Sequence, residues 1–222
     1  MGPASLVVFD LDGTLIDSRR DLAESANEML ASYGAPALGE DEIVAMVGCG
    51  AATLVKRVIA AAGVDAPLDS ALPRFLAIYD GRLTSHTRPY PGIAGLLEEL
   101  RAASVAMALL TNKPLEQTLK ILEAFQLSRY FRSVLGGDGP WPRKPAPDGL
   151  RFLMEQATVS PRETLLVGDS TIDLQTARNA GVRICLARYG FGFADLRPDE
   201  LRGDEWIADT PADIAGALHA GR

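Results

Sequence analysis

Apolar residues along this chain follow two alternating patterns. Residues 5–10 form a short, mostly apolar run that ends in Asp10, which predicts a buried strand. After Ser18 the apolar residues recur at the spacing of one helix face, namely Leu22, Ala26, Met29, Leu30 and Tyr33. Ser18 stands where this helix would begin and Asp21 follows three residues later, so we expect the two to form a near capping box.

The rest of the chain divides into a helical stretch and a stretch of alternating strands and helices. Between residues 18 and 88 the pattern predicts only helices, bounded by Gly or Pro, at 41–47, 51–62 and 69–83. From residue 91 onward it predicts strands at 105–110, 133–135, 164–167, 182–186 and 206–207. The helices expected in this second stretch are 91–103, 114–125, 148–156, 172–180 and 211–220.

This division predicts an α/β fold with an insertion. Strand–helix alternation is typical of a doubly wound parallel sheet, whereas about seventy helical residues is long for a crossover connection. We expect a Rossmann-like core formed by residues 1–16 and 88–222, with an inserted all-helical cap domain formed by residues 17–87. The connections near Asp17 and at residues 87–91 would be the two hinges of the cap domain.

The composition of the chain limits the classes of molecule that it is expected to bind. The 222 residues carry a formal net charge of −7, which argues against nucleic acid and acidic membranes as partners. The apolar content of 47% is enough for a core, and no apolar run approaches membrane length. Two cysteines are too few for a disulfide framework, and His86 and His219 are too isolated to suggest a zinc centre. We expect a cytoplasmic monomer or homodimer whose partner is a small molecule.

Polar residues gather at the ends of the predicted strands. Asp10 and Asp12 follow the first strand, and side chains at i and i+2 of an extended segment point to the same side. Their like charges repel, so a divalent cation or a lysine must lie beside them. Ligands bind at the carboxyl ends of strands in open α/β sheets, so we expect one sheet edge to gather the polar residues that follow other strands or lie in nearby loops: Thr111, Asn112, Lys144, Asp169 and Asp173.

Each of these residues also has a purely structural explanation. Residues 10–13 could form a strand-to-turn connection, and Thr111–Asn112 could lead from a strand into a helix cap. Lys144 could be a solvated loop lysine, although the prolines around it favour a rigid loop. Residues 169–171 could be an N-cap cluster, but capping explains one acceptor there and not two acids four residues apart.

The run Asp-Leu-Asp-Gly-Thr at residues 10–14 resembles the DxDGT signature of the haloacid dehalogenase-like superfamily. The other signatures of that superfamily follow in the same order, so the resemblance covers essentially the whole chain. It implies that Asp10 attacks phosphorus to form a phospho-aspartate and that Asp12 serves as general acid and base. It also implies that Lys144 contacts both Asp10 and the phosphate.

The same resemblance implies a Mg²⁺ ion. Its ligands would be the side chains of Asp10 and Asp169 and the backbone carbonyl of Asp12, with Asp173 in support directly or through water. The Thr111 side chain and the backbone amide of Asn112 would hold a phosphate oxygen, so these two residues would bind substrate.

A glycine-rich turn in the helical stretch is the expected specificity segment. Residues 47–52, which we call the lid turn, contain Gly48 and Gly50, and glycine lets the backbone approach a ligand closely. The N-terminus of the helix that follows favours an anion, and Lys56 and Arg57 on that helix are further substrate-binding candidates. A plain helix–helix turn with a basic outer face is the alternative.

Several segments, including the lid turn and Lys144-Pro145-x-Pro147, are similar to the phosphoglycolate phosphatases within the superfamily. The resemblance implies a Mg²⁺-dependent phosphatase of small phosphate esters, with 2-phosphoglycolate as the expected substrate. Cys49 departs from the pattern, because a polar residue is usual at that place. A sugar-phosphate phosphatase or phosphomutase remains open as an alternative, and a non-catalytic binding protein is a more distant one.

Overall fold

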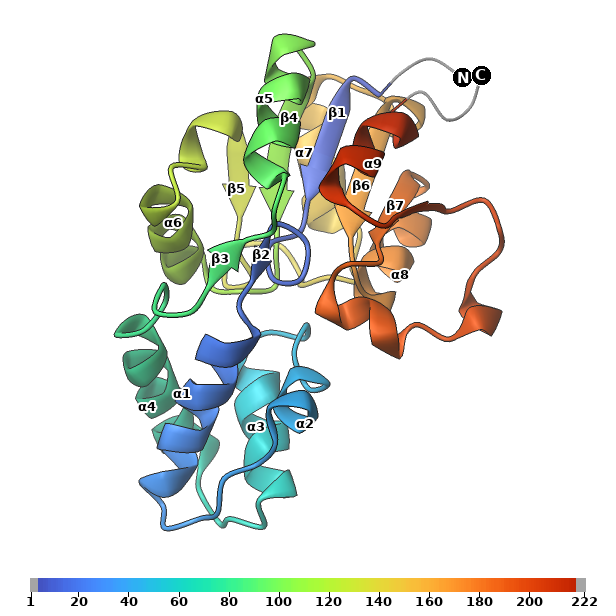
Figure 1. The fold of residues 1–222 in the computed structure, drawn as a ribbon. Helices are drawn as coiled ribbons and strands as arrows, with labels where there is room; N and C mark the ends of the chain where they lie inside the picture. The colour runs from blue at the N-terminus through green and yellow to red at the C-terminus, as the bar shows by residue number, and fades with distance from the viewer. Residues whose placement is uncertain (1–3, 219–222) are drawn as a thin grey trace.

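The computed structural model describes residues 4–218 and is built around a six-stranded parallel sheet (Figure 1). The strand order is β5-β4-β1-β6-β7-β8, so the chain starts at an inner strand, builds outward on one side and then on the other. The strands are β1 (Leu6–Phe9), β4 (Ala106–Leu110), β5 (Ser133–Leu135), β6 (Thr164–Gly168), β7 (Arg183–Ala187) and β8 (Trp206–Ala208). This arrangement confirms the α/β, doubly wound fold expected from the sequence.

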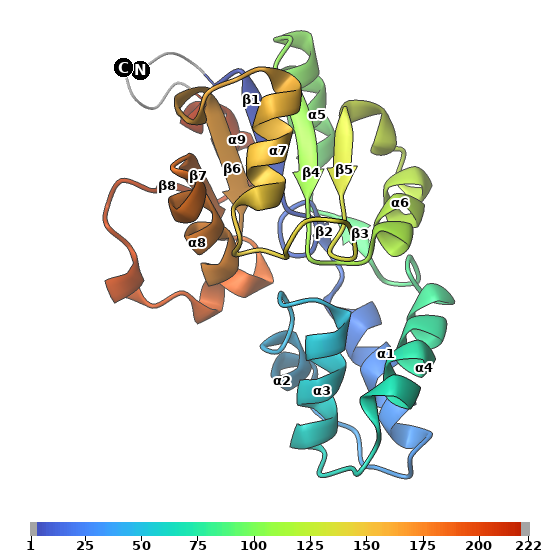
Figure 2. The same cartoon turned by 180° about the vertical axis from the view of Figure 1, so that it is seen from behind.

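Helices cover both faces of the sheet, as the two opposite views show (Figures 1 and 2). On one face, Val7 and Phe9 of β1 belong to a buried cluster with apolar residues of α5 (Ile93–Ala102) and α9 (Pro211–Ala217). On the other face, Leu6 and Val8 belong to a cluster with residues of α7 (Asp148–Ala157) and α8 (Thr171–Ala180). Successive side chains of a strand point to opposite faces, which explains why a continuous apolar run forms β1.

The four helices between β1 and the rest of the sheet stand apart from it (Figure 1). These cap helices are α1 (Arg19–Ala31), α2 (Glu40–Val44), α3 (Ala51–Ala61) and α4 (Leu68–Asp80). Two short strands, β2 (Ile16–Asp17) and β3 (Arg88–Pro89), connect them to the core and pair with each other in antiparallel orientation. The sequence did not predict this ribbon, because two-residue strands are too short to show a periodicity.

The remaining elements border the sheet: α6 (Leu115–Ala124) and the 3₁₀ turns η1 (Ser128–Tyr130), η2 (Pro161–Glu163), η3 (Phe191–Asp195) and η4 (Pro198–Glu200). Observed helix ends differ from the expected ones by a few residues, as at α4, which ends at Asp80 and not at residue 83. The end of the helix expected over 211–220, and His219 with it, lies outside the described residues. None of the helices within residues 4–218 is both long and apolar enough to cross a bilayer.

The capping box expected at Ser18 and Asp21 is wrong. Ser18 does occupy the N-cap position of α1, but it makes no side-chain capping bond. Its hydroxyl donates instead to Asp12 Oδ1 at 2.6 Å. The buried Asp21 carboxylate accepts hydrogen bonds from the backbone N–H groups of His86 and Thr87, in the segment before β3. Long-range partners compete here with the local capping pattern.

Candidate active site

The carboxyl ends of three neighbouring strands bring the polar residues together. Asp10 follows β1, Thr111 follows β4 and Asp169 follows β6, and these strands are adjacent in the order β4-β1-β6. All three residues line one cavity of about 280 Å³ that extends to the cap helices. The edge that the sequence predicted as the ligand site therefore opens onto a cavity between the core and the cap helices.

Lys144 lies at the centre of the buried charges. Its Nζ is 2.9 Å from Asp10 Oδ1 and donates a hydrogen bond to Asp173 Oδ1 at 2.6 Å. Burial alone would lower the pKa of Lys144, but the charges of Asp10 and Asp173 outweigh it and hold that pKa above its usual value. The lysine is a charged member of the site and not the solvated loop residue of the alternative explanation.

Asp10, Asp169 and Asp173 form a group whose carboxylate oxygens lie within 4.8 Å of one another. Burial raises the pKa of Asp10 to about 6, with Lys144 opposing this shift and Asp173 adding to it. Burial, and then the charges of Asp173 and Asp10, raise the pKa of Asp169 well above its usual value. A single lysine does not neutralise three buried carboxylates. The group fits a hard divalent cation with oxygen ligands.

Gly13 and Thr14, which follow Asp12 in the first signature, position the Asp169 side chain. Gly13 has a φ of +84°, and a Cβ at this position would lie 1.9 Å from Asp169 Oδ2, so a side chain is excluded on both grounds. Thr14 donates its hydroxyl to Asp169 Oδ1 at 3.3 Å, and the backbone N–H of Gly192 donates to Asp169 Oδ2 at 2.7 Å. The turn after β1 therefore shapes the site for a carboxylate that lies 155 residues away in sequence.

Asp12 faces a different set of partners. Its carboxylate accepts hydrogen bonds from the Ser18 hydroxyl at 2.6 Å and from Lys113 Nζ at 3.0 Å to each oxygen. Its side chain is not part of the Asp10–Asp169–Asp173 group, in keeping with the sequence-based assignment of metal binding to its backbone carbonyl alone. That backbone role stays a prediction.

Lys113 is a site residue that the sequence reasoning missed. The side chain is buried, and besides its two bonds to Asp12 it donates to the Tyr79 hydroxyl at 2.6 Å. Tyr79 belongs to α4, so this contact joins the cap helices to the catalytic edge. Burial would lower the pKa of Lys113, but Asp12 and then Tyr79 hold it above its usual value. The only signal was a lysine directly after Thr111-Asn112.

Thr111 and Asn112 do not cap α6, whose N-cap is Pro114 and which has no side-chain capping bond. Thr111 Oγ1 accepts from the Lys113 backbone N–H at 3.2 Å. Asn112 Nδ2 donates to the carbonyls of Gly48 and Lys144, each at 2.9 Å. The Asn112 side chain thus joins the lid turn to the Lys144 loop, and the helix-cap explanation of the pair is wrong.

Ser170 and Asp173 do form a capping box at the start of α8. Asp173 Oδ2 accepts from the Ser170 backbone and hydroxyl, while its Oδ1 binds Lys144. The N-cap explanation is therefore correct for part of this segment, and the same acid also belongs to the charged group.

The chain matches the model of the haloacid dehalogenase-like hydrolases over residues 7–187. It belongs to this family. A Pseudomonas aeruginosa protein named phosphoglycolate phosphatase 1 is 40% identical, with 94% of this chain and 81% of that protein covered. The phosphoglycolate phosphatase of Pseudomonas putida is 41% identical, with coverages of 92% and 76%.

A solved structure from Haemophilus somnus 129pt, described as a predicted phosphoglycolate phosphatase, superimposes with a TM-score of 0.92 at 30% identity. The superposition covers 99% of this chain and 100% of that one. The resemblance to the haloacid dehalogenase-like superfamily, first inferred from the motif at residues 10–14, is confirmed.

In this hydrolase the lid turn lies against the catalytic edge. Gly48, Cys49 and Gly50 line the cavity, and the two glycines have φ angles of +110° and +89°. A Cβ at Gly50 would come within 3.1 Å of the Asn112 carbonyl oxygen, so this backbone is close to the core. The alternative of a plain helix–helix turn does not account for these contacts.

The expected role of Lys56 needs correction. Lys56 is exposed and does not line the cavity, whereas its neighbour Arg57 does. Successive helix residues point in directions about 100° apart, so only one of the two faces the hollow. Both residues were candidates from the sequence, because the sequence does not show how α3 is rotated relative to the cavity.

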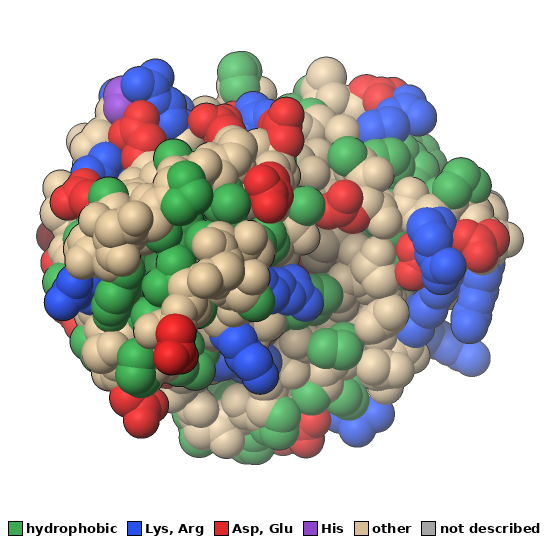
Figure 3. All heavy atoms as spheres, turned by 90° about the horizontal axis from the view of Figure 1, so that it is seen from below, with side chains coloured by type: hydrophobic (Ala, Val, Ile, Leu, Met, Phe, Trp, Pro, Cys, Tyr) green, Lys and Arg blue, Asp and Glu red, His purple; other side chains and the backbone are tan. Residues whose placement is uncertain are grey.

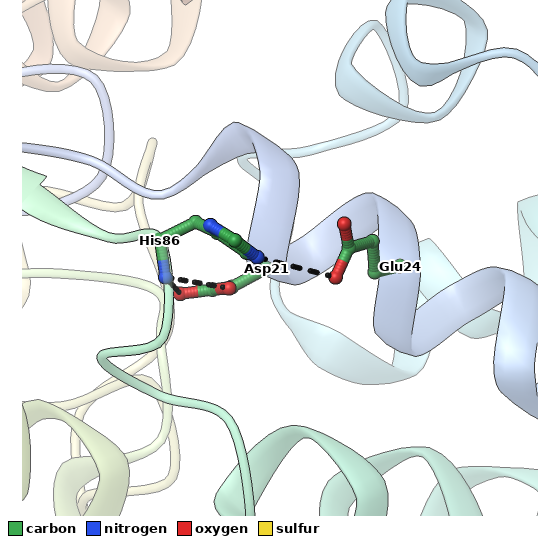
Figure 4. Close-up of side chains that lie close together, drawn as sticks. All are labelled: Asp21, Glu24 and His86. Atoms are coloured by element: carbon green, nitrogen blue, oxygen red, sulfur yellow. Dashed lines mark hydrogen bonds and ion pairs between the residues drawn. The ribbon is translucent and has the colours of Figure 1, made fainter.

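A second group, Asp21, Glu24 and His86, lies where α1 meets the segment before β3 (Figure 4). Besides the backbone bonds described above, Asp21 Oδ2 accepts from the Thr87 hydroxyl at 2.7 Å. Glu24 is paired with Arg20 and Arg82, and His86 Nε2 is 3.8 Å from Glu24 Oε2. These contacts tie α1 to the segment before β3, and this structural role accounts for the group.

Proposed function

We propose that this hydrolase is a Mg²⁺-dependent phosphatase that converts 2-phosphoglycolate to glycolate and phosphate. The observation that carries the proposal is the buried Asp10–Asp169–Asp173 group with Lys144 at its centre, on the catalytic edge of a haloacid dehalogenase-like fold. The relatives named phosphoglycolate phosphatase, at about 40% identity, support the substrate. Residues 17–87 would act as a cap domain over a core of residues 1–16 and 88–222.

In the first half of the proposed reaction, a carboxylate oxygen of Asp10 forms a bond to phosphorus while the ester P–O bond breaks. The electron pair stays on the leaving oxygen, which takes a proton from Asp12. In the second half, Asp12 takes a proton from water as the water oxygen attacks phosphorus, and the bond from Asp10 to phosphorus breaks. Inorganic phosphate is then released.

Other residues would hold charge during these steps. Lys144, already between Asp10 and Asp173, would neutralise a phosphate oxygen, and Thr111 with the Asn112 backbone amide would bind another. Mg²⁺, when bound by Asp10, Asp169 and the Asp12 carbonyl with Asp173 in support, would supply the positive charge that lets a carboxylate approach a phosphate dianion.

Hydrogen bonds hold the Asp12 side chain on the proposed catalytic edge. Its oxygens accept from Lys113 and Ser18, and these bonds orient the side chain in this structure. To give a proton to the leaving group, Asp12 must loosen these bonds. Tyr79 binds Lys113 from α4, so a movement of the cap helices would change the hold on Asp12.

The test is phosphate release from a panel of phosphate esters, each measured with Mg²⁺ and with a chelator. We expect 2-phosphoglycolate to have the highest kcat/KM and chelation to abolish turnover. Equal release in chelator would overturn the metal-dependent mechanism. A preference for hexose phosphates would favour the sugar-phosphate phosphatase, and phosphate transfer to an added sugar without net release would favour the mutase.

A further inference from the structure

Two cationic side chains that line the cavity, Lys113 and Arg57, differ in whether an acidic side chain already pairs with them. Lys113 is committed to Asp12 by two hydrogen bonds. Arg57, which lies on α3 among the cap helices, forms no ion pair with a carboxylate within residues 4–218. It is also exposed, so a ligand in the cavity can reach it from the rim. Arg57 is thus a positive charge at the cavity that no acidic side chain in the described part of the chain neutralises.

The Arg57 guanidinium is held against the lid turn. Nη1 donates to the Met46 carbonyl at 3.1 Å, and Nη2 donates to Cys49 Sγ at 3.7 Å. A guanidinium carries more N–H donors than these two contacts use. The side chain is therefore oriented by its own protein and still has donors for a ligand, which reduces the entropy that binding must overcome.

The surroundings of Arg57 strengthen its effect on an anion. The cap side of the cavity is lined mainly by apolar side chains: Leu22, Val44, Val47, Leu54, Phe75 and Leu76. Charge interactions are screened less beside such a wall than in water. Seen from the cap end, the surface carries acidic and basic side chains together, so no broad basic face draws the substrate in (Figure 3). The attraction of the substrate must therefore come from cations at the cavity itself.

We infer that Arg57 binds the carboxylate of the substrate and so makes the cap selective for phosphate esters that carry a second anionic group. This inference rests on the proposed phosphatase function and assigns the substrate feature that the cap reads. The cavity is lined by Asp10, Asp12, Asp169 and Asp195, which would repel a substrate carboxylate that had no cation of its own. Arginine pairs with a carboxylate through two parallel hydrogen bonds, which adds direction to the attraction.

The experiment compares Arg57→Met with Lys56→Met on two substrates of similar length. One is 2-phosphoglycolate, and the other is 2-hydroxyethyl phosphate, in which a hydroxymethyl group replaces the carboxylate. We expect Arg57→Met to lower kcat/KM for 2-phosphoglycolate by about 10- to 100-fold, mainly through KM, because a charge-assisted contact is lost. The same variant should hydrolyse 2-hydroxyethyl phosphate within about two-fold of wild type.

Lys56→Met is the matched control, because it removes the same charge from the adjacent, exposed position outside the cavity lining. Its kinetics should follow wild type on both substrates. Arg57→Lys keeps the charge but not the planar fork, so its loss on 2-phosphoglycolate should be smaller than that of Arg57→Met. Thermal unfolding of each variant checks that the fold is retained.

Three results would overturn the inference. One is an equal loss on both substrates in Arg57→Met, and another is no loss on either. The third is a wild-type enzyme that does not prefer carboxylate-bearing esters, including 3-phosphoglycerate, to 2-hydroxyethyl phosphate. Failure of the proposed function is distinguishable, because it would appear in the wild-type enzyme as absent phosphate release from every ester or as a preference for hexose phosphates.

Discussion

The core side and the cap side of the cavity, which we call the core wall and the cap wall, differ in how their charges are arranged. On the core side, buried acids lie beside buried lysines, with Lys144 between Asp10 and Asp173 and Lys113 against Asp12. On the cap side, apolar side chains dominate and Arg57 supplies a charge that has no carboxylate partner among residues 4–218. A wall of buried charges held in place suits bond making and breaking, whereas a mostly apolar wall with few polar groups suits selection among substrates.

This contrast follows from the elements that build each wall. Strand ends in a parallel sheet are fixed by hydrogen bonds on both sides, as at β1 between β4 and β6. The cap helices are tied to the core by the β2–β3 ribbon, the Asp21 bonds and the contact from Tyr79 to Lys113. The proposed chemistry therefore lies on the wall that the sheet fixes, and the proposed selectivity lies on the wall formed by the cap helices.

Asp10→Asn should cause the largest loss of activity of the changes proposed here. The change is nearly isosteric, but an amide is not a nucleophile toward phosphorus, so we expect no phosphate release above background from 2-phosphoglycolate. The measurement is steady-state phosphate release at saturating substrate and Mg²⁺. Asp195→Asn is the control, since Asp195 is an exposed acid that lines the same cavity, and this variant should stay within a few-fold of wild type. Retained turnover in Asp10→Asn would exclude the covalent intermediate.

Asp12→Ala should have the next largest effect. We expect kcat to fall by about 10²–10⁴-fold, the usual contribution of a general acid–base residue. Its side chain lies outside the Asp10–Asp169–Asp173 group, so Mg²⁺ affinity measured by calorimetry should change little. The substitution leaves Lys113 buried without its carboxylate, which costs stability, so Asp12→Asn serves as a companion that keeps the side-chain volume. Turnover near the wild-type rate in both variants would remove Asp12 from the mechanism.

The core wall was largely predictable from the sequence. A buried strand that ends in an acid has a local pattern, and parallel topology carries such ends to one edge, so Asp10, Lys144, Asp169 and Asp173 could be placed together before the structure was known. Their roles as catalytic and metal-binding residues stay predictions. The geometry shows only that they are close enough to share a cation.

The contacts of Lys113, within the core wall and with the cap wall, were not predictable. Lys113 and Asp12 are 101 residues apart, and Lys113 and Tyr79 are 34 residues apart. Contacts between residues so far apart produce no periodic pattern in the sequence. The choice between Lys56 and Arg57 depends on the rotation of α3 about its axis relative to the core. The sequence fixes which face of that helix is apolar but not where the cavity lies beside it.

Tyr79→Phe should have the smallest effect and tests whether the cap wall acts on the core wall. The change removes only the hydroxyl that accepts from Lys113, while the ring that lies parallel to Phe75 is kept. Loss of one hydrogen bond to a charged group should lower kcat by about two- to tenfold, with KM little changed. Tyr33→Phe, a cap tyrosine bonded to Ser70 and outside the cavity lining, is the control and should match wild type.

The double variant Tyr79→Phe with Lys113→Met decides whether this effect passes through Lys113. Lys113→Met alone should lower kcat more than Tyr79→Phe, because it removes both hydrogen bonds to Asp12. If Tyr79 acts on catalysis by holding Lys113, adding Tyr79→Phe to Lys113→Met should cost nothing further, since the two residues then belong to one interaction. Additive losses would mean that the Tyr79 hydroxyl acts on substrate independently of Lys113, and the cap wall would then read the substrate at a second place besides Arg57.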